Sequence, residues 1–473
     1  MDRALVFVGV LRRPGPFLRP ACVEAAQRPA SRCTPDHLAH RAPRIRRGVL
    51  GRAPALPHRS NAEGRDGPGG TRMRIAHVGV EIVPAENGAF VGGLVKNVAT
   101  VGAAQVRHGH DVHVVTSDVR GRFTEDQPTP YGHVHRVPTT GTYGSAVFAA
   151  TFLARAGRTV RRLHRAFPFD LIHVHSAYAS LGAIRYTLGR LGIPMVFSLY
   201  SPNFRARPGH DCNGSRALGR RRIARRALRA FDRTIVPSEN LRSRVVELGI
   251  PDEAVSQILP ALDPTLLGSL PTREEARRRL GLPERAPVVL FVGNYSPWKG
   301  VESLLHAMAD VRTSNPEAIL VTAWGEPYEW DGNRRDGVLG LIQRLGLDTA
   351  VRQVGIVPDV ETLLRAADLL VSPFECTCKV LDYPLSILEA MACERPVIST
   401  NVGGIPELLD GGERGILVEP RDRTALVRAI RAILEDPSRA QAIGRSGARW
   451  VRDRAGPESV LASVMSVYGE VGA

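Results

Sequence analysis

The chain has 473 residues, of which 43% are hydrophobic and 23% are charged, and its formal net charge is +16. This composition is typical of a globular protein with two or three domains. No stretch approaches the roughly 20 consecutive apolar residues that a membrane-spanning helix needs, which excludes an integral membrane protein built of helices.

Much of the positive charge lies at the N-terminus, where residues 1–72 contain 14 Arg and 5 acidic residues. This stretch is rich in Pro and Gly and shows no sustained helical or strand period. We therefore expect a disordered Arg/Pro-rich tail, or a start assigned too far upstream of Met73. The arginines lack interleaved aromatic residues and the rest of the chain is only weakly basic, so we expect no nucleic acid partner.

The six cysteines follow no even framework. Cys376 and Cys378 form only a C-x-C pair, which matches neither a zinc ribbon nor a thioredoxin-type motif. The sequence therefore predicts a protein of a reducing compartment, the cytoplasm.

From Met73 onward, apolar strands and helices alternate. An apolar stripe at helical spacing, residues 94–104, separates the first two strands. The strands expected in the first half of the chain are Arg74–Val80, Asp111–Ser117, Asp170–His175, Pro194–Tyr200, Arg233–Pro237 and Ser256–Pro260. Strands that alternate with helices predict a parallel sheet with right-handed crossovers.

A charged stretch punctuated by prolines, Asp263 to Pro287, is typical of a connection between domains. The alternation then restarts, with expected strands at Val288–Val292, Ala318–Ala323, Arg352–Val354, Leu369–Ser372, Pro396–Thr400 and Ile416–Val418. The expected helices are Val301–Met308, Val360–Ala367, Ser386–Cys393, Asp422–Leu434 and Glu458–Tyr468. We predict an α/β fold of two tandem doubly wound domains, residues 73–265 and 266–455, with an interdomain cleft at the carboxyl ends of both sheets. Residues 456–473 would form a separate C-terminal helix.

Two loops at strand-to-helix junctions are suited to bind an anion, because helix N-termini present free N–H groups there. The first contains Gly92 and Gly93, which would let a ligand approach the backbone closely; a flexible turn is the alternative. The second, FVGNYSPWKG, places Lys299 at a helix start, where an ammonium group is unfavourable unless an anion such as phosphate offsets it. A solvated lysine is the alternative, and the spacing of a Walker loop is absent.

A single carboxylate, Glu389, lies in the otherwise apolar helix expected at Ser386–Cys393. Ser386 and Glu389 have the S-x-x-E spacing of a capping box, so Glu389 could cap its own helix. Alternatively, this carboxylate could accept paired hydrogen bonds from the two hydroxyls of a ribose and so hold the nucleoside half of a nucleotide sugar.

Four segments resemble, in order, motifs of the family 4 glycosyltransferases, the retaining enzymes of the GT-B fold. They are GGLVKNVATVGAAQVRHGHDVHVV for the first glycine-rich unit, DLIHVHS for the acceptor-side strand, FVGNYSPWKGVESLL for the diphosphate loop and EAMACERPVISTNVGGIPELL for the sugar-nucleotide motif. The resemblance covers nearly all of residues 73–455 and implies two Rossmann-like domains. It also implies a UDP-, GDP- or ADP-sugar donor, held mainly by the C-terminal domain, and a final helix that crosses back to the N-terminal domain.

The resemblance assigns roles to individual residues. It implies that Glu389 binds the ribose, that Lys299 binds the donor diphosphate and takes part in catalysis, and that Gly93 approaches the donor phosphate from the opposite wall. The donor-binding residues expected on this basis are Gly92, Gly93, Asn294, Lys299, Asp382, Leu385, Ser386 and Glu389.

Four features depart from the family's pattern. One is that the Asn-Gly often found after the last strand of the N-terminal domain is Ala261-Leu262. The first glutamate of the usual E-x7-E motif is replaced by Leu381, beside which only Asp382 could substitute. The usual glycine between the glutamates is Pro384, which has no N–H to offer a ligand. The arginine often found in the diphosphate loop is Asn294. These departures indicate altered sugar recognition.

His175 lies at the end of the acceptor-side strand. One interpretation is that it contacts the acceptor or the donor sugar and has a catalytic role. The alternative is that it is a buried histidine at the end of a strand. His173 lies on the same face of that strand. The chain contains no D-x-D carboxylate pair for Mg²⁺ or Mn²⁺, so we expect no metal, and Lys299 with helix N-termini would stabilise the leaving diphosphate. The resemblance implies attack on the face from which the diphosphate departs, without a protein nucleophile.

The segment GRRRIARRALRAFDR, residues 219–233, contains seven arginines on an expected helix. One interpretation is that these arginines form a solvated face of the helix. The other is that they bind an anionic acceptor or an anionic membrane surface, and membrane binding would place the protein at the periphery of a membrane. The sequence as a whole predicts a metal-independent retaining hexosyltransferase that acts on a hydroxyl acceptor, which could be a glycan, a lipid or a small molecule. The alternative is a catalytically weak sugar-nucleotide-binding scaffold of the same fold, which Leu381 and Pro384 favour.

Overall fold

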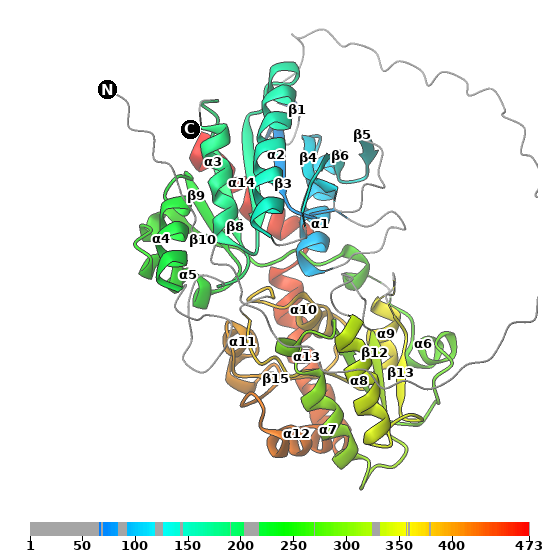
Figure 1. Ribbon diagram of the computed structural model, residues 1–473. Helices are drawn as coiled ribbons and strands as arrows, with labels where there is room; N and C mark the ends of the chain where they lie inside the picture. Colours follow the sequence, from blue (N-terminus) through cyan, green and yellow to red (C-terminus); the bar gives the residue numbers. More distant parts are fainter. Residues whose placement is uncertain are drawn as a thin grey trace, which may run out of the picture. The chain divides into compact units, whose positions relative to one another are not determined.

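The computed structural model contains two parallel sheets, each covered by helices (Figure 1). It describes residues 66–67, 70–83, 92–118, 126–141, 145–189, 191–202, 217–268, 270–323, 332–355, 357, 360–377 and 380–472. All of these belong to the second of two units into which the chain divides, Gly64–Ala473. The predicted α/β class with two Rossmann-like domains is confirmed.

The N-terminal sheet has eight strands in the order β10-β9-β8-β7-β3-β4-β6-β5. Its strands are β3 (Arg74–Gly79), β4 (Asp111–Asp118), β5 (Asp126–Thr129), β6 (Gly132–Pro138), β7 (Leu171–Ser176), β8 (Met195–Leu199), β9 (Arg233–Val236) and β10 (Val255–Gln257). Every neighbouring pair is parallel except β5 with β6. The carboxyl ends of β3, β4, β6, β7 and β8 therefore meet at one edge of the sheet.

The helices of this domain are α1 (Gly93–Arg107), α2 (Ala146–Ala166), α3 (Ile184–Leu188), α4 (Ala217–Leu228) and α5 (Glu239–Glu247). The longest, α2, buries Phe148, Phe152, Ala156, Val160 and Leu163, which recur every three or four residues and so share one face. Four of them, Phe152, Ala156, Val160 and Leu163, pack in one core cluster with strands β3, β4 and β7. Ser145 caps this helix by accepting a hydrogen bond from the Phe148 N–H.

The C-terminal sheet has six strands, all parallel, in the order β13-β12-β11-β14-β15-β16. They are β11 (Val288–Val292), β12 (Ile319–Ala323), β13 (Val351–Gln353), β14 (Leu369–Ser372), β15 (Val397–Thr400) and β16 (Ile416–Val418). The helices are α6 (Arg273–Arg279), α7 (Val301–Val311), α8 (Gly332–Arg344), α9 (Val360–Ala366), α10 (Leu385–Ala392), α11 (Ile405–Leu408), α12 (Arg423–Glu435) and α13 (Pro437–Arg454). The central strands β11, β14 and β15 are almost completely buried, as expected of a sheet covered on both faces.

The final helix, α14 (Pro457–Gly472), packs on the N-terminal sheet. Its residues Val460, Val464 and Val467 share a buried cluster with Ile75 of β3 and Leu171 of β7. Figure 1 shows this helix in red behind the strands of that sheet. The described part of the chain contains no helix that is both long and apolar enough to cross a membrane.

Every expected strand is present, most of them within one or two residues of the expected bounds. The structure also contains β5, β6 and α2, in a region where the sequence analysis expected no element. A short antiparallel pair, β1 (Asp66–Gly67) with β2 (Gly70–Thr71), lies within the stretch 1–72 that was expected to be a tail. Residues 1–65 lie outside the described residues.

Candidate functional site

Lys299 lies in the loop that follows β11. A short 3-10 helix, Pro297–Lys299, ends at Gly300, which is the N-cap of α7. Gly300 has a φ of 73°, and a Cβ at this position would come within 1.9 Å of the Pro373 carbonyl oxygen. Only glycine fits there, because the backbone is left-handed and lies directly against its neighbour. This packing fixes Lys299 immediately before the N-terminus of α7.

The ammonium group of Lys299 lies over an aromatic ring. Its Nζ lies 4.8 Å from the ring centroid of Phe374, and burial lowers its pKa to about 8. Within the described part of the chain, Lys299 forms no ion pair. The residue as a whole is half-buried. Nearby in the loop, Asn294 Oδ1 accepts a hydrogen bond from the Ser296 N–H at 3.2 Å.

Two serine hydroxyls next to this loop are buried without a hydrogen-bond partner among the described residues. They are Ser296 Oγ, three residues before Lys299, and Ser372 Oγ at the end of β14. A buried hydroxyl without a partner is costly, so each is available to a polar ligand. The sequence analysis did not identify either serine.

Glu389 does not cap its own helix. Helix α10 begins at Leu385 with Pro384 as its N-cap and without a side-chain cap, so the capping-box alternative is wrong. Its carboxylate instead accepts a hydrogen bond from Lys96 Nζ of α1 at 2.8 Å. The two residues are 6% and 8% exposed, which makes this a buried ion pair between the two domains.

The two charges of this pair influence one another. Burial acts to lower the pKa of Lys96, but the adjacent Glu389 carboxylate raises it above its ordinary value. Burial raises the pKa of Glu389, and the Lys96 ammonium offsets only part of that shift. Each charge therefore depends on the other, because either one alone would be desolvated without compensation.

Gly93 of the first loop lies against the start of α10. Gly92 has a φ of 103° and is the N-cap of α1, without a side-chain cap. A Cβ on Gly93 would come within 2.7 Å of Leu381 Cδ1 and 3.0 Å of Leu385 Cβ. The structure thus brings the start of α1 together with the start of α10. The preceding residues, 84–91, lie outside the described residues, and Ser386 lies within the first turn of α10.

Asp382 is completely buried and fully engaged by protein groups. Its Oδ2 accepts hydrogen bonds from Ser238 Oγ at 2.5 Å and Asn240 Nδ2 at 2.7 Å, and its Oδ1 accepts one from Thr377 Oγ1 at 2.9 Å. Ser238 and Asn240 lie at the N-terminus of α5, where a carboxylate is favourable. The geometry therefore favours a role in holding the domains together over the expected role in donor binding.

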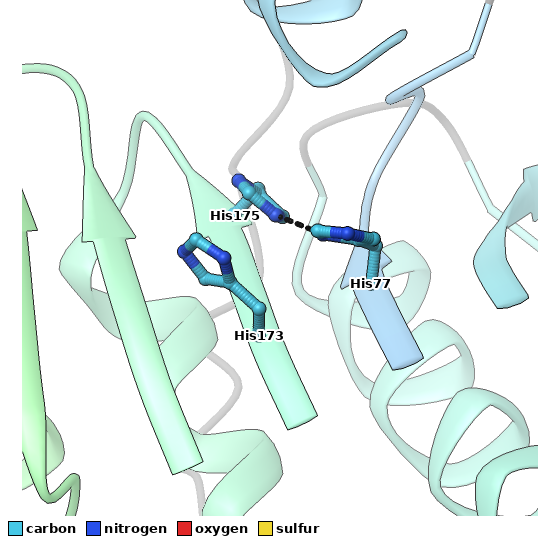
Figure 2. Close-up of side chains that lie close together, drawn as sticks. All are labelled: His77, His173 and His175. Carbon is cyan, nitrogen blue, oxygen red and sulfur yellow. Dashed lines mark hydrogen bonds between the residues drawn. The ribbon is translucent and has the colours of Figure 1, made fainter. Parts of the chain in front are cut away.

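His175 belongs to a buried group of three histidines from two neighbouring strands (Figure 2). Its ring nitrogens contact His77 Nδ1 at 2.7 Å and the Tyr200 hydroxyl at 3.0 Å. His173 contacts the hydroxyl groups of Tyr468 at 2.6 Å and Ser198 at 2.7 Å. Burial lowers the pKa of all three imidazoles, to about 4 for His77 and well below the ordinary value for the other two.

The groups next to these histidines determine which atoms donate and which accept hydrogen bonds. The Ala261 N–H donates to Asn97 Oδ1 at 2.7 Å, so the amide nitrogen of Asn97 donates to the Tyr200 hydroxyl at 2.9 Å. At the other end, Gln105 Oε1 can only accept, so His77 donates from Nε2 and accepts at Nδ1 from His175 Nε2–H. His175 Nδ1 then accepts from the Tyr200 hydroxyl.

Further hydrogen bonds link the histidines to Tyr468 of the C-terminal helix α14. His77 Nε2–H donates to Gln105 Oε1 at 2.7 Å, and the Gln105 amide nitrogen lies 3.5 Å from the Tyr468 hydroxyl. Tyr468 then donates to His173 Nδ1, and His173 Nε2–H donates to Ser198. All six ring nitrogens are used, and every imidazole is neutral. The geometry favours the buried strand-end alternative for His175 over contact with a substrate.

These histidines are also spaced closely enough to hold a metal ion, since one ring nitrogen of each lies within 4.8 Å of the others. All six ring nitrogens already make hydrogen bonds, so a metal ion would have to replace one of these bonds at each histidine. We therefore assign this group to the structure of the domain.

The arginine-rich segment forms the end of α4 and the turn after it. Arg222, Arg225, Arg226 and Arg229 are exposed, and Arg233 pairs with Glu470 of α14 at 2.5 Å. Ile223 is 56% exposed, so it is not part of the buried stripe, which consists of Ala224, Ala227 and Leu228.

Cys376, of the C-x-C pair, is disulfide-bonded. Cys393, at the end of α10, is free and buried, and burial raises the pKa of its thiol to about 12.

Two family descriptions match the chain, one for each domain. "Glycosyltransferase Family 4" matches residues 91–266, and "Glycosyl transferases group 1" matches residues 272–450. The second match contains Lys299 and Glu389, and the first contains Lys96.

Similar proteins span most of the chain. A D-inositol 3-phosphate glycosyltransferase from Thermobispora bispora is 29% identical over 72% of this chain and 78% of its own length. An N-acetyl-alpha-D-glucosaminyl L-malate synthase from Bacillus anthracis is 24% identical over 83% and 97%. Among solved structures, the sucrose-phosphate synthase from Thermosynechococcus elongatus has a TM-score of 0.75 at 25% identity, over 84% of this chain and 99% of its own. Anabaena HepE in complex with UDP-glucose, at 19% identity and a TM-score of 0.65, shares the fold over 84% of this chain and 100% of its own.

Proposed function

Because the chain belongs to the family 4 glycosyltransferases, we propose that it transfers a hexose from a nucleotide-diphosphate sugar to a hydroxyl acceptor, with retention of configuration and without a bound metal ion. The observation that carries this proposal is the shielded ammonium group of Lys299, which has no ion-pair partner in the described part of the chain. It lies where the N-terminus of α7 also attracts negative charge, so a diphosphate would satisfy both.

The ribose of the donor nucleotide would bind to the carboxylate of Glu389. In the donor-free protein, Lys96 neutralises this carboxylate at 2.8 Å. Two ribose hydroxyls could donate to the same oxygens, and Lys96 would then be released.

The departing diphosphate carries the charge that the site must stabilise. We assign this work to Lys299, to the N-terminal N–H groups of α1 and α7, and to the buried hydroxyl of Ser296. These groups are held in place before the reaction, which is what makes electrostatic stabilisation effective.

The reaction itself needs no protein nucleophile. The acceptor oxygen forms a bond to the anomeric carbon on the face from which the diphosphate leaves, and the electron pair of the breaking C–O bond departs with the diphosphate. The acceptor hydroxyl's proton passes to an oxygen of that diphosphate. Asp382 and His175 take no part in these steps, because both are occupied by buried protein contacts.

The donor would be a UDP-, GDP- or ADP-sugar, and the acceptor a molecule with a free hydroxyl group. The names of two relatives refer to D-inositol 3-phosphate and L-malate, both of which carry hydroxyl groups. This supports the acceptor class but selects no member of it.

The protein would act in the cytoplasm, with α4 in contact with an anionic membrane surface. The support for this contact is a set of four exposed arginines flanked by the exposed Ile223 and Tyr186. Such a surface favours electrostatic attraction with shallow insertion.

Replacing Lys299 by Ala should weaken donor binding and slow sugar transfer by at least about tenfold, since a charge-assisted contact contributes roughly 1.5–3 kcal/mol. The wild type should also bind its donor about tenfold more weakly at pH 9 than at pH 7, because a lysine with a pKa of about 8 loses its charge in that interval. Calorimetric titration with the donor at both pH values measures both effects.

The donor is identified first, by incubating the protein with UDP-, GDP- and ADP-sugars and measuring release of the nucleoside diphosphate. Release with one donor supports the proposal, and release with none contradicts it. The Lys299→Arg variant serves as the matched control, because it keeps its charge at pH 9 and should show a flat pH dependence. If Lys299→Ala keeps the wild-type kinetics, Lys299 is not part of the site.

A further inference from the structure

A second basic site lies in the N-terminal domain, between β6 and α2. It is a cavity of about 220 Å³ lined by His135, Arg136, Val137 and Pro138 of β6 and by Arg155, Arg158, Thr159 and Arg162 of α2. We refer to it as the arginine pocket. Its volume is below the roughly 300–1,000 Å³ of sites that hold drug-sized ligands, so a complete nucleotide sugar does not fit.

The pocket concentrates positive charge from one helix face. Arg155, Arg158 and Arg162 are three, then four, residues apart on α2, so they share that face. Helix α2 carries five arginines and no acidic residue to compensate them. Four guanidinium groups thus line the cavity, and none of the residues that line it is a carboxylate.

The arginines of α2 are not committed to protein carboxylates. Arg155 donates from Nη1 to the Pro138 carbonyl oxygen at 2.8 Å, which anchors the side chain over the end of β6. Neither it, nor Arg158, nor Arg162 forms an ion pair within the described part of the chain. Two described acidic residues are in register with this part of β6: Asp118 opposite Pro138 and Asp126 opposite His135. Asp118 does not line the pocket.

We propose that the arginine pocket binds a phosphate group, carried by a small soluble molecule or by a lipid headgroup. Guanidinium groups match the geometry of phosphate oxygens and form paired hydrogen bonds with them. The hydroxyl of Thr159 adds a further donor. The pocket lies toward the carboxyl end of β6, at the sheet edge from which the loops of the donor site also emerge. The site would therefore hold a phosphorylated ligand on the N-terminal domain independently of the donor.

The test compares three variants with the wild type. Arg158→Ala/Arg162→Ala removes two exposed charges from the pocket, and alanine favours the helix, so folding is preserved. Arg165→Ala/Arg445→Ala removes the same charge from two exposed positions away from the pocket and serves as the control. Lys299→Ala marks the donor site.

Inorganic pyrophosphate is titrated into each protein by calorimetry. The pocket variant is expected to lose at least about tenfold in affinity relative to the control, whereas Lys299→Ala keeps the pocket's binding. Each protein is also sedimented with vesicles of phosphatidic acid and of phosphatidylcholine. Loss of pyrophosphate binding in the pocket variant identifies a soluble ligand, and loss of phosphatidic acid binding alone identifies a lipid headgroup.

Equal behaviour of the pocket variant and the control with both probes would overturn the proposal. This failure is distinct from a failure of the proposed function, which would appear as absent release of nucleoside diphosphate in a protein that still binds pyrophosphate through the arginine pocket.

Discussion

Lys96→Met and Glu389→Gln are expected to destabilise the protein by similar amounts, but only Glu389→Gln is expected to weaken nucleotide binding. Each variant leaves one buried charge without its partner, which costs roughly 3–5 kcal/mol. The double variant should lose less than the sum of the two single variants, since the two residues are in contact at 2.8 Å. Urea unfolding, monitored by circular dichroism, measures these differences.

Nucleotide binding separates a functional carboxylate from a purely structural one. If Glu389 accepts the ribose hydroxyls, Glu389→Gln should weaken binding of the donor nucleotide by at least about tenfold. Lys96→Met should keep or raise the affinity for the nucleotide, because it removes the group that competes for the carboxylate. Calorimetric titration with the nucleotide, at one salt concentration, measures the affinity of each variant.

The exposed ion pair between Arg452 and Glu394, at 3.0 Å, provides the matched control. Glu394→Gln should change the free energy of unfolding by less than about 1 kcal/mol and leave nucleotide binding intact. Equal loss of nucleotide affinity in Lys96→Met and Glu389→Gln would mean that the pair only joins the domains.

The protein is expected to lose stability steeply as the pH falls below 6.5. His77 has a pKa of about 4 in the folded protein against an ordinary value of 6.5. The unfolded chain therefore binds more protons than the folded protein between these values, so acid favours unfolding. For His77 alone, this amounts to about 2 kcal/mol at pH 5. His173 and His175 shift in the same direction and add to the loss.

The contribution of His77 is isolated by substitution. His77→Gln keeps a donor and an acceptor but cannot be protonated, so its stability should fall less steeply between pH 7 and pH 5. His133 is exposed on β6, and His133→Gln should retain the wild-type slope. The free energy of unfolding is measured in urea at four pH values. A His77→Gln slope equal to that of the wild type would show that the buried histidines do not control acid stability.

The alternating strands were predictable because each is a short apolar run bounded by turn residues. The elements between residues 126 and 166, which are β5, β6 and α2, were not predicted from the sequence. Strand β6 reads GHVHRVP, and it buries His135 and Arg136, which do not indicate a strand. Helix α2 did carry a signal, since Phe148, Phe152, Ala156 and Val160 recur every four residues, but its arginines weaken the apolar pattern.

The candidate site was only partly predictable for a related reason. Glu389 was conspicuous as a single carboxylate in an apolar helix, and Lys96 is the same anomaly of opposite charge in GLVKNVATV. Pairing the two would have required knowing that α1 and α10 meet, which is a tertiary contact between residues 293 positions apart. The same limit applies to Asp382, whose partners Ser238 and Asn240 lie in the other domain.

A crystal structure of the protein with its donor nucleotide tests the central claim most directly. We predict that both ribose hydroxyls lie within hydrogen-bonding distance of the Glu389 carboxylate, that the diphosphate contacts Lys299, and that Lys96 has left Glu389. A nucleotide bound elsewhere, with the ion pair of Lys96 and Glu389 intact, would contradict this account.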